Sequence, residues 1–156
     1  MAIKIAFFNH KGGVGKTTSL FNLGARLAQK GKTVLMIDAD TQCNLTLQIL
    51  GERGYEKYYE ENPKKNIKSY LAPAFDSQPI LITAGDCISA KINNLFVMPG
   101  SLDLSGNDTQ LSMSFNLSTF LTSMQNLPGS FDYLIQKTSE KYNAEYILID
   151  LNPSLS

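Results

Sequence analysis

Residues 11–18 combine residue types that suit the binding of a phosphate group, in the order Lys-Gly-Gly-Val-Gly-Lys-Thr-Thr. Glycines let backbone N–H groups wrap round phosphate oxygens without side-chain clashes. A lysine at position 16 can reach the terminal phosphate oxygens of a nucleoside triphosphate, and the hydroxyl of Thr17 can bind Mg²⁺. We therefore expect a phosphate-binding loop that consists of Lys11, Gly12, Gly13, Val14, Gly15, Lys16, Thr17 and Thr18.

The segments on either side of this loop fit that expectation. Residues 3–8 form a short apolar run that predicts a buried strand. Residues 16–30 repeat apolar side chains at helical spacing, with Gly24 and Ala28 allowing close packing on a sheet. Gly31 is suited to end this helix in the left-handed conformation. A strand that enters the loop and a helix that leaves it aim the helix N-terminus at an anion, which favours a phosphate site over an incidental glycine-rich turn.

Three carboxylates are expected at the ends of two other strands. Asp38 and Asp40 follow the apolar run 33–37, and Asp150 follows the run 146–149. The carboxyl ends of parallel strands form the ligand-binding edge of an α/β sheet. Two carboxylates two residues apart need a cation or hydrogen-bond donors nearby, and Mg²⁺ with its water molecules suits that place. A structural alternative is that Asp38 or, less readily, Asp40 caps the helix that follows.

The remaining segments complete the prediction of an α/β fold. A further strand is expected at 94–98, and further helices around 117–124 and after a turn at 128–129, with Ser130 as the N-cap. Residues 51–94 contain tyrosines among charges and are interrupted by prolines, so we expect short helices and loops there. Strands that alternate with helices predict a parallel sheet flanked by helices and joined by right-handed crossovers.

The composition fits one globular domain of 156 residues, with 43% apolar and 18% charged residues. No apolar stretch approaches the roughly 18 residues of a membrane span, and the N-terminus is not that of a secretory signal, so we expect a cytoplasmic protein. Cys43 and Cys87 are too few for a disulfide framework and are expected to be reduced thiols. Residues 1–68 hold eleven basic and six acidic residues, whereas residues 69–156 hold three and eight. Outside the loop, we interpret the basic excess as a solvated surface rather than a nucleic-acid patch.

The loop departs from the common pattern G-x-x-x-x-G-K-[ST], because a histidine replaces the first glycine and a second lysine, Lys11, follows it. In this feature the chain resembles the deviant Walker A ATPases of the ParA/MinD type. Residues 38–46, Asp-Ala-Asp-Thr-Gln-Cys-Asn-Leu-Thr, resemble the family's D-x-D-x-Q-x-N-x-T, with Thr41 where proline is frequent. Residues 146–154 resemble its Walker B strand followed by D-x-P-P-S, with Asn152 in place of the first proline.

This resemblance implies a P-loop NTPase fold, the cofactors ATP and Mg²⁺, and roles for the site residues. The catalytic residues implied are Lys11, Lys16 and Asp40. Lys11 is expected to reach across a nucleotide-sandwich dimer to phosphates held by the other subunit, where it neutralises charge in the transition state as an arginine finger does. Asp40 is expected to orient or activate the attacking water. The magnesium ion and its water shell are expected to be served by Thr17, Asp38 and Asp150.

The resemblance extends from residue 2 to residue 156, and the family's domain is longer than that. We therefore interpret residues 1–156 as the N-terminal part of a single P-loop ATPase domain, apparently truncated after the Walker B strand, with 51–94 as a variable segment. By resemblance, the function is that of a ParA-like partitioning ATPase in plasmid or chromosome segregation. An ATP-dependent homodimer, a partner protein that stimulates hydrolysis, and nonspecific DNA bound through the missing C-terminal half are implied as its partners.

Other functions fit the same loop. A MinD-like member is positioned at the membrane by a C-terminal amphipathic helix, although the pattern of residues 38–46 favours the partitioning branch. A nucleotide-sensing module without hydrolysis does not need the complete set of lysine, threonine and carboxylates described above. An iron–sulfur reductase of the nitrogenase type shares the loop, but the two cysteines of this chain fit its cluster poorly.

Overall fold

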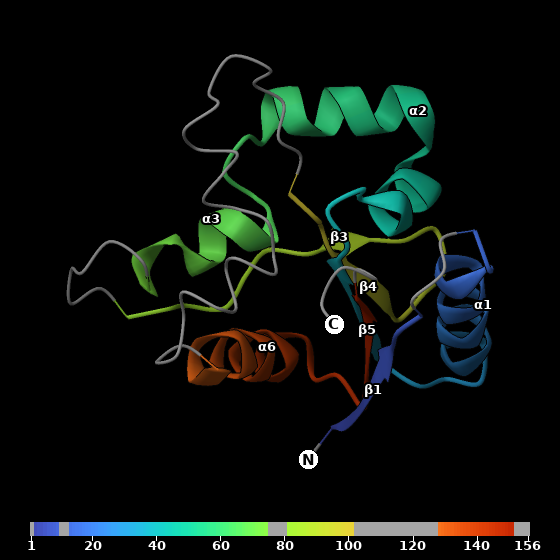
Figure 1. Ribbon diagram of the computed structural model, residues 1–156. Coiled ribbons are helices and arrows are strands. Elements are labelled where there is room, and N and C mark those ends of the chain that lie inside the picture. The colour runs from blue at the N-terminus through green and yellow to red at the C-terminus, as the bar shows by residue number, and fades with distance from the viewer. Residues whose placement is uncertain (1, 10–12, 75–80, 102–127, 152–156) are drawn as a thin grey trace.

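The computed structural model describes residues 2–9, 13–74, 81–101 and 128–151 (Figure 1). The helix expected around residues 117–124 lies outside these ranges, as do Lys11, Gly12 and Asn152. Within the described ranges, the chain forms a central sheet with helices on both of its faces.

The sheet in the described part of the chain has five strands in the order β1-β5-β2-β4-β3. Its four longer strands run parallel to one another and are β1 (Ile3–Phe7), β2 (Val34–Ala39), β4 (Leu95–Met98) and β5 (Tyr146–Leu151). The short strand β3 (Ile88–Ser89) pairs antiparallel with β4. Every residue of β2 is buried, because a central strand of a parallel sheet is covered on both faces. The expected α/β fold with a parallel sheet is confirmed.

Helices cover the two faces of this sheet. Helix α1 (Lys16–Gln29) lies on one face, whereas α3 (Ile67–Leu71) and α6 (Pro128–Tyr142) lie on the other (Figure 1). Helix α2 (Asn44–Glu61) follows β2 and bends at Gly51, whose φ of 69° and ψ of 166° are not helical. No helix in the described ranges is both long enough and apolar enough to cross a membrane.

Each face of the sheet has its own hydrophobic core. The core beneath α1 contains Leu20 and Met36, and the core beneath α6 contains Leu134 and Ile147. Helix α1 approaches the sheet closely, because a Cβ atom added to Gly24 would lie only 2.8 Å from Sδ of Met36. The expected close packing of this helix through its small residues is confirmed.

Several details differ from the expectations drawn from the sequence. Helix α6 begins at Pro128, so residues 128–129 do not form a turn and Ser130 is not its N-cap. Proline is favourable at a first helical position, because its fixed φ suits the helix and no N–H donor is needed there. Strand β2 extends to Ala39, so Asp38 lies inside the strand rather than after it. Within residues 51–94, strand β3 was not predicted, because two residues are too few to show a periodic pattern.

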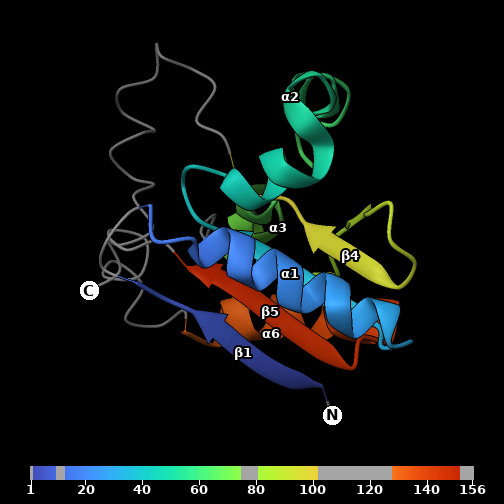
Figure 2. The same cartoon turned by 90° about the vertical axis from the view of Figure 1, so that its right-hand side faces the viewer.

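The strand register brings the predicted site residues to one edge of the sheet. Asp150 in β5 pairs with Asp38 in β2 on one side and with Phe7 in β1 on the other. Helix α1 runs along β5, as Figure 2 shows, and its first residue, Lys16, lies at the carboxyl end of that strand. Because parallel strands end at a common edge, the start of α1 and the carboxylates meet there.

Candidate functional site

The described part of the phosphate-binding loop turns sharply into α1. Gly13 and Gly15 have φ angles of 73° and 81°, in the left-handed region that strains other residues. Gly15 is the N-cap of α1, and its carbonyl accepts a 2.8 Å hydrogen bond from the N–H of Ser19. The first N–H groups of a helix have no partners inside the helix, and the helix dipole makes this end favourable for an anion. The loop and the start of α1 therefore suit the binding of phosphate.

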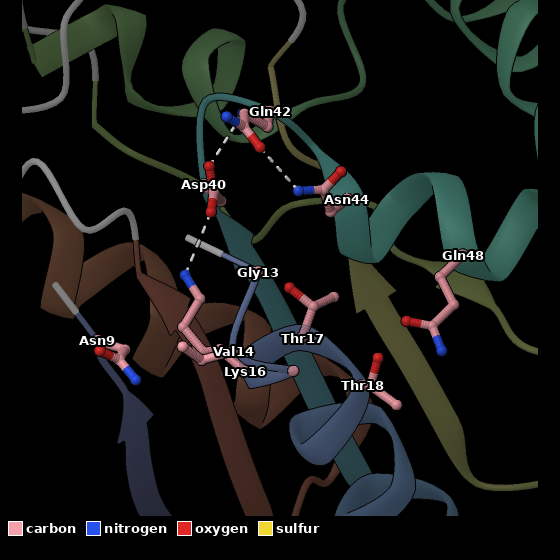
Figure 3. Close-up of a pocket in the computed structure, with 11 residues that line it drawn as sticks. Asn9, Gly13, Val14, Lys16, Thr17, Thr18, Asp40, Gln42, Asn44 and Gln48 are labelled. Carbon is pink, nitrogen blue, oxygen red and sulfur yellow. Dashed lines mark hydrogen bonds and ion pairs between the residues drawn. The ribbon is translucent and has the colours of Figure 1, made fainter. Parts of the chain in front are cut away.

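Lys16 extends from the first position of α1 between two carboxylates. Its Nζ lies 2.9 Å from Oδ1 of Asp150 and 3.2 Å from Oδ2 of Asp40, and it also donates to the carbonyl of Leu151. The side chains of Lys16, Asp40 and Asp150 are only 11%, 7% and 0% exposed, so water shields these ion pairs weakly. Figure 3 shows the lysine directed at Asp40. The fold thus brings together three residues that the sequence predicts to belong to the site.

Thr17 lies beside the carboxylate of Asp150. Its hydroxyl donates a 2.7 Å hydrogen bond to Oδ2, whereas Oδ1 is buried and has the lysine at ion-pair distance without a hydrogen bond. Mg²⁺ in proteins keeps several waters and takes only one or two carboxylates together with substrate phosphates. The carboxylate of Asp150 and the hydroxyl of Thr17 are oxygen ligands of the kind that suits such an ion. No group of three or more acidic, histidine or cysteine side chains that could hold a metal is present in the described ranges.

Lys16, Thr17 and Asp40 line a pocket of about 370 Å³ at the carboxyl edge of the sheet (Figure 3). Small-molecule sites typically have about this volume or more. Thr18 lies on the α1 side of the pocket and Gln48 on the α2 side, and Gln48 belongs to none of the predicted site motifs. The lining residues are Asn9, Gly13, Val14, Gly15, Lys16, Thr17, Thr18, Asp40, Gln42, Asn44 and Gln48.

Asp40 is held by the turn that joins β2 to α2. Its Oδ1 accepts a 3.0 Å hydrogen bond from the N–H of Gln42, and its carbonyl accepts one of 3.0 Å from the N–H of Cys43. The side chain of Asn44 donates a further 3.0 Å bond to the side chain of Gln42. Cys43 ends the turn with a left-handed φ of 52°. These contacts orient the carboxylate of Asp40 so that its Oδ2 reaches Lys16.

Asp38 lies two residues before Asp40 but is not among the residues that line the pocket. Its Oδ2 accepts bonds of 2.8 Å from the N–H and 2.5 Å from the hydroxyl of Thr46, in the first turn of α2. Burial raises the pKa of Asp38 to about 7, whereas the hydrogen bonds from Thr46 act in the opposite direction. The contacts agree with the structural alternative, in which this carboxylate supports the start of the helix. Its role toward magnesium stays a prediction.

Two residues next to Asp38 received no role from the sequence. Gly100 follows β4 and donates a 3.0 Å hydrogen bond from its N–H to the hydroxyl of Thr46. Tyr59 in α2 donates a 2.7 Å bond to the carbonyl of Gly100. Thr46 belongs to the D-x-D-x-Q-x-N-x-T pattern and could have been singled out from it. Tyr59 and Gly100 carry no such signal, because only the packing of α2 against the end of β4 brings them together.

The remaining predicted site residues, Lys11 and Gly12, lie outside the described residues, so their roles stay predictions. Cys43 and Cys87 are free thiols, as expected. Burial raises the pKa of each thiol to about 12, so both are protonated at neutral pH.

Comparison with known proteins decides the family. A family model described as "AAA domain" matches residues 2–156. The chain belongs to this family. Curated proteins that resemble the chain include two that are named Soj. The chain is 33% identical over 155 residues to the chromosome-partitioning ATPase Soj of Treponema pallidum. This alignment covers 99% of the chain and 50% of the relative. It is 35% identical over 153 residues to the sporulation initiation inhibitor protein Soj of Bacillus subtilis, with 97% and 50% covered. The chain spans about half the length of these relatives.

Solved structures confirm the P-loop fold of this AAA domain. A protein of Corynebacterium diphtheriae, DIP2308, is similar with a TM-score of 0.72 and 27% identity over 99% of the chain and 53% of that structure. A plasmid partition protein of Borrelia burgdorferi bound to AMPPNP has a TM-score of 0.60 and 28% identity, with 100% and 55% covered. The ParA of pNOB8 bound to nonspecific DNA has a TM-score of 0.57 and 27% identity, with 99% and 48% covered. The resemblance to the ParA family is confirmed by these findings.

Proposed function

We propose that this chain is the nucleotide-binding part of a ParA-type partitioning ATPase, which binds ATP with Mg²⁺ and hydrolyses the ATP to ADP and phosphate. The observation that carries the proposal is the position of Lys16. Its ammonium group lies between the carboxylates of Asp40 and Asp150, next to the threonine hydroxyl and at the start of α1. The partition protein of Borrelia burgdorferi that binds AMPPNP supports the choice of ATP.

The loop and the N-terminus of α1 bind the triphosphate in this proposal, and Lys16 contacts its outer phosphates. The phosphate oxygens compete with Asp40 for the lysine, because both are anions within its reach. Nucleotide binding therefore releases the Asp40 carboxylate from an ion pair of 3.2 Å and makes it available to a water molecule. Thr17 and Asp150 are the residues that hold Mg²⁺, which supplies positive charge to the phosphates.

Asp40 then orients the attacking water by accepting a hydrogen bond from it. The water oxygen forms a bond to the γ-phosphorus, and the bond between this phosphorus and the β,γ-bridging oxygen breaks. ADP leaves with the electron pair of the broken bond, and both protons of the water remain on the phosphate product, which forms as H₂PO₄⁻. Lys16 neutralises charge on the phosphate oxygens during this step.

The finer parts of the proposal concern assembly. ATP joins two copies of the protein, Lys11 of each copy reaches the phosphates held by the other, and a partner protein stimulates hydrolysis. The dimer binds DNA without sequence preference, in the cytoplasm at the nucleoid, and the ParA of pNOB8 bound to nonspecific DNA supports this choice. Binding that rests on contacts to DNA phosphates weakens steeply as salt is added. We expect these contacts in the half of the relatives that this chain does not match.

Phosphate release from ATP, measured with and without Mg²⁺, tests the enzymatic part. We expect phosphate release that requires Mg²⁺. Failure of the chain to bind ATP in the presence of Mg²⁺ contradicts the proposal. Parallel binding assays with duplex DNA and with anionic lipid vesicles test the surface on which the protein acts. Binding to vesicles but not to DNA favours a MinD-like function instead.

A further inference from the structure

We propose that Thr46 is a positioning residue for hydrolysis, because it acts through Asp38 to fix the backbone that carries Asp40. The inference rests on the proposed function and assigns Thr46 a task that the loop and the carboxylates described above do not perform. It also assigns Asp38 to the support of Asp40 rather than to the water shell of Mg²⁺.

Thr46 joins three elements of the fold through one buried side chain. Its hydroxyl donates 2.5 Å to Oδ2 of Asp38 in β2 and accepts 3.0 Å from the N–H of Gly100 after β4. Its own N–H donates a second bond, of 2.8 Å, to the same carboxylate oxygen. Thr46 and Asp38 are both 0% exposed, so water cannot replace these bonds. Hydrogen bonds away from water are electrostatically stronger than those at the surface.

The contacts continue from Asp38 to Asp40. The N–H of Asp40 lies within 3.4 Å of Oδ1 of Asp38, so the carboxylate that binds Thr46 also faces the backbone of Asp40. The carbonyl of Asp40 in turn accepts a bond from Cys43, the N-cap of α2. The turn between β2 and α2 is thereby held by hydrogen bonds on its strand side and on its helix side, and Thr46 provides the contact on the helix side.

The surroundings leave little freedom for another arrangement. A Cβ atom added to Gly100 would lie 3.1 Å from Cγ of Asp38 and 2.6 Å from Sγ of Cys43. The carbonyl of Gly100 is held by Tyr59 from the second half of α2. When the hydroxyl of Thr46 is removed, the N–H of Gly100 loses its acceptor. Oδ2 of Asp38 then keeps only the backbone N–H of Thr46 as a donor from this residue. The start of α2 can then shift relative to β2, and the carboxylate of Asp40 shifts with the turn.

The inference can be tested by Thr46→Val, which removes the hydroxyl, and the chain offers a matched control for this substitution. Thr138 in α6 is also 0% exposed, and its hydroxyl also accepts a 3.0 Å bond from a glycine N–H, that of Gly85. It donates to the carbonyl of Leu134 instead of to a carboxylate. Thr138→Val therefore removes a buried hydroxyl with the same kind of partner, in a helix that carries none of the predicted site residues. Both substitutions keep the shape of the side chain.

The test compares Thr46→Val, Thr46→Ser and Thr138→Val in the whole chain. We expect Thr46→Val to lower kcat for ATP by at least about tenfold, because a misplacement of about 1 Å can cost this much, while the Kd for a fluorescent ATP analogue stays the same. Thr46→Ser keeps the hydroxyl and should have the native kcat. Thr138→Val should leave both kcat and Kd unchanged. Amide hydrogen exchange is measured in parallel. Exchange should become faster for the amides of residues 40–46 in Thr46→Val, and for the amide of Gly85 in Thr138→Val.

Equal kcat values for Thr46→Val and Thr138→Val overturn the inference, as does unchanged exchange at residues 40–46. A joint loss of kcat and nucleotide affinity in Thr46→Val also overturns it, because that result indicates general damage to the site. If Thr46→Val does not fold, Asp38→Asn replaces it, and its kcat must fall while Kd is kept. Absence of ATP turnover in the native chain contradicts the proposed function, whereas the exchange measurement decides by itself whether Thr46 holds the turn.

Discussion

The hydroxyl of Thr17 donates a 2.7 Å hydrogen bond to Oδ2 of Asp150, although 133 residues separate the two along the chain. Thr17 belongs to the first turn of α1, and Asp150 lies near the end of β5. The bond therefore joins the predicted phosphate loop to the strand that resembles a Walker B strand. It also marks the place where a magnesium ion is expected under the proposed function.

Removal of this hydroxyl is expected to weaken the magnesium dependence of ATP binding. For Thr17→Val we expect the affinity for ATP with Mg²⁺ to fall by about tenfold or more, because groups that orient a metal site commonly contribute 10- to 100-fold. Affinity without Mg²⁺ should change little. Titration of a fluorescent ATP analogue with and without EDTA measures both values. Thr17→Ser, which keeps the hydroxyl, serves as the control, and equal loss in both variants would argue against the role.

Lys16 is expected to support both the fold and the binding of phosphate. Lys16→Met leaves Asp40 and Asp150 close together without their cation, so the free energy of unfolding should fall by about 1.5–3 kcal/mol. Binding of ATP should be lost or strongly reduced. Chemical denaturation and nucleotide titration measure the two effects. Lys30→Met removes an exposed lysine at the end of the same helix and should affect neither, so a similar effect of both substitutions would contradict the prediction.

Asp40 is expected to support turnover and not to strengthen the binding of ATP. Asp40→Asn keeps an acceptor for the N–H of Gln42 but removes the charge that pairs with Lys16. We expect kcat to fall by about 10²- to 10⁴-fold, the usual contribution of a positioned acid or base. The affinity for ATP should be equal or higher, because the lysine loses a competing anion. Single-turnover kinetics separate the two effects, and unchanged turnover would remove Asp40 from the mechanism. Asp132→Asn changes an exposed carboxylate and is the control.

Gly100 is expected to tolerate no side chain. Gly100→Ala places Cβ 2.6 Å from Sγ of Cys43, so the unfolding free energy should fall by about 1–3 kcal/mol, as for other overpacked sites. Cys43→Ala in the same chain removes the sulfur and should recover part of this loss. A double-mutant cycle by urea denaturation measures the coupling between the two positions. Strict additivity of the two changes would show that the contact does not limit Gly100.

A surface ion pair between Asp86 and Lys141 gives a prediction for pH. The hydrogen bond from Lys141, 2.6 Å long, holds the pKa of Asp86 below its usual range. A lowered folded-state pKa stabilises the fold above the unfolded value of about 3.9, and this contribution is lost as pH falls through the folded value. Lys141→Met should therefore lower stability by up to about 1 kcal/mol at pH 7, and by much less at pH 2–3.

Thermal unfolding across this pH range, with Lys91→Met as an exposed control, checks the prediction. If Lys141→Met loses the same stability at both ends of the pH range, the effect belongs to the apolar stem of the lysine and not to its charge.

Much of the site could be predicted because its residues follow local patterns. A few neighbouring residues are enough to recognise each of three elements: the loop to Thr18, the helix that starts at Lys16 and the strand that ends near Asp150. The roles given to Asp38 and Ser130 show the limit of this reasoning. A carboxylate at a strand end can serve a cation or a helix, and a serine after proline and glycine can begin a helix or lie inside it. Which one occurs depends on partners that are distant in the sequence.

The sequence by itself determined the phosphate loop, the parallel strands and the family, because these depend on residue types at short and regular spacing. Only the tertiary structure decided that Asp40 and Asp150 both face Lys16, and that Asp38 faces Thr46. It also decided that Tyr59 and Gly100 belong to the same cluster. The physical reason is that a buried polar group must find a partner, and the order and register of the strands select that partner from the whole chain.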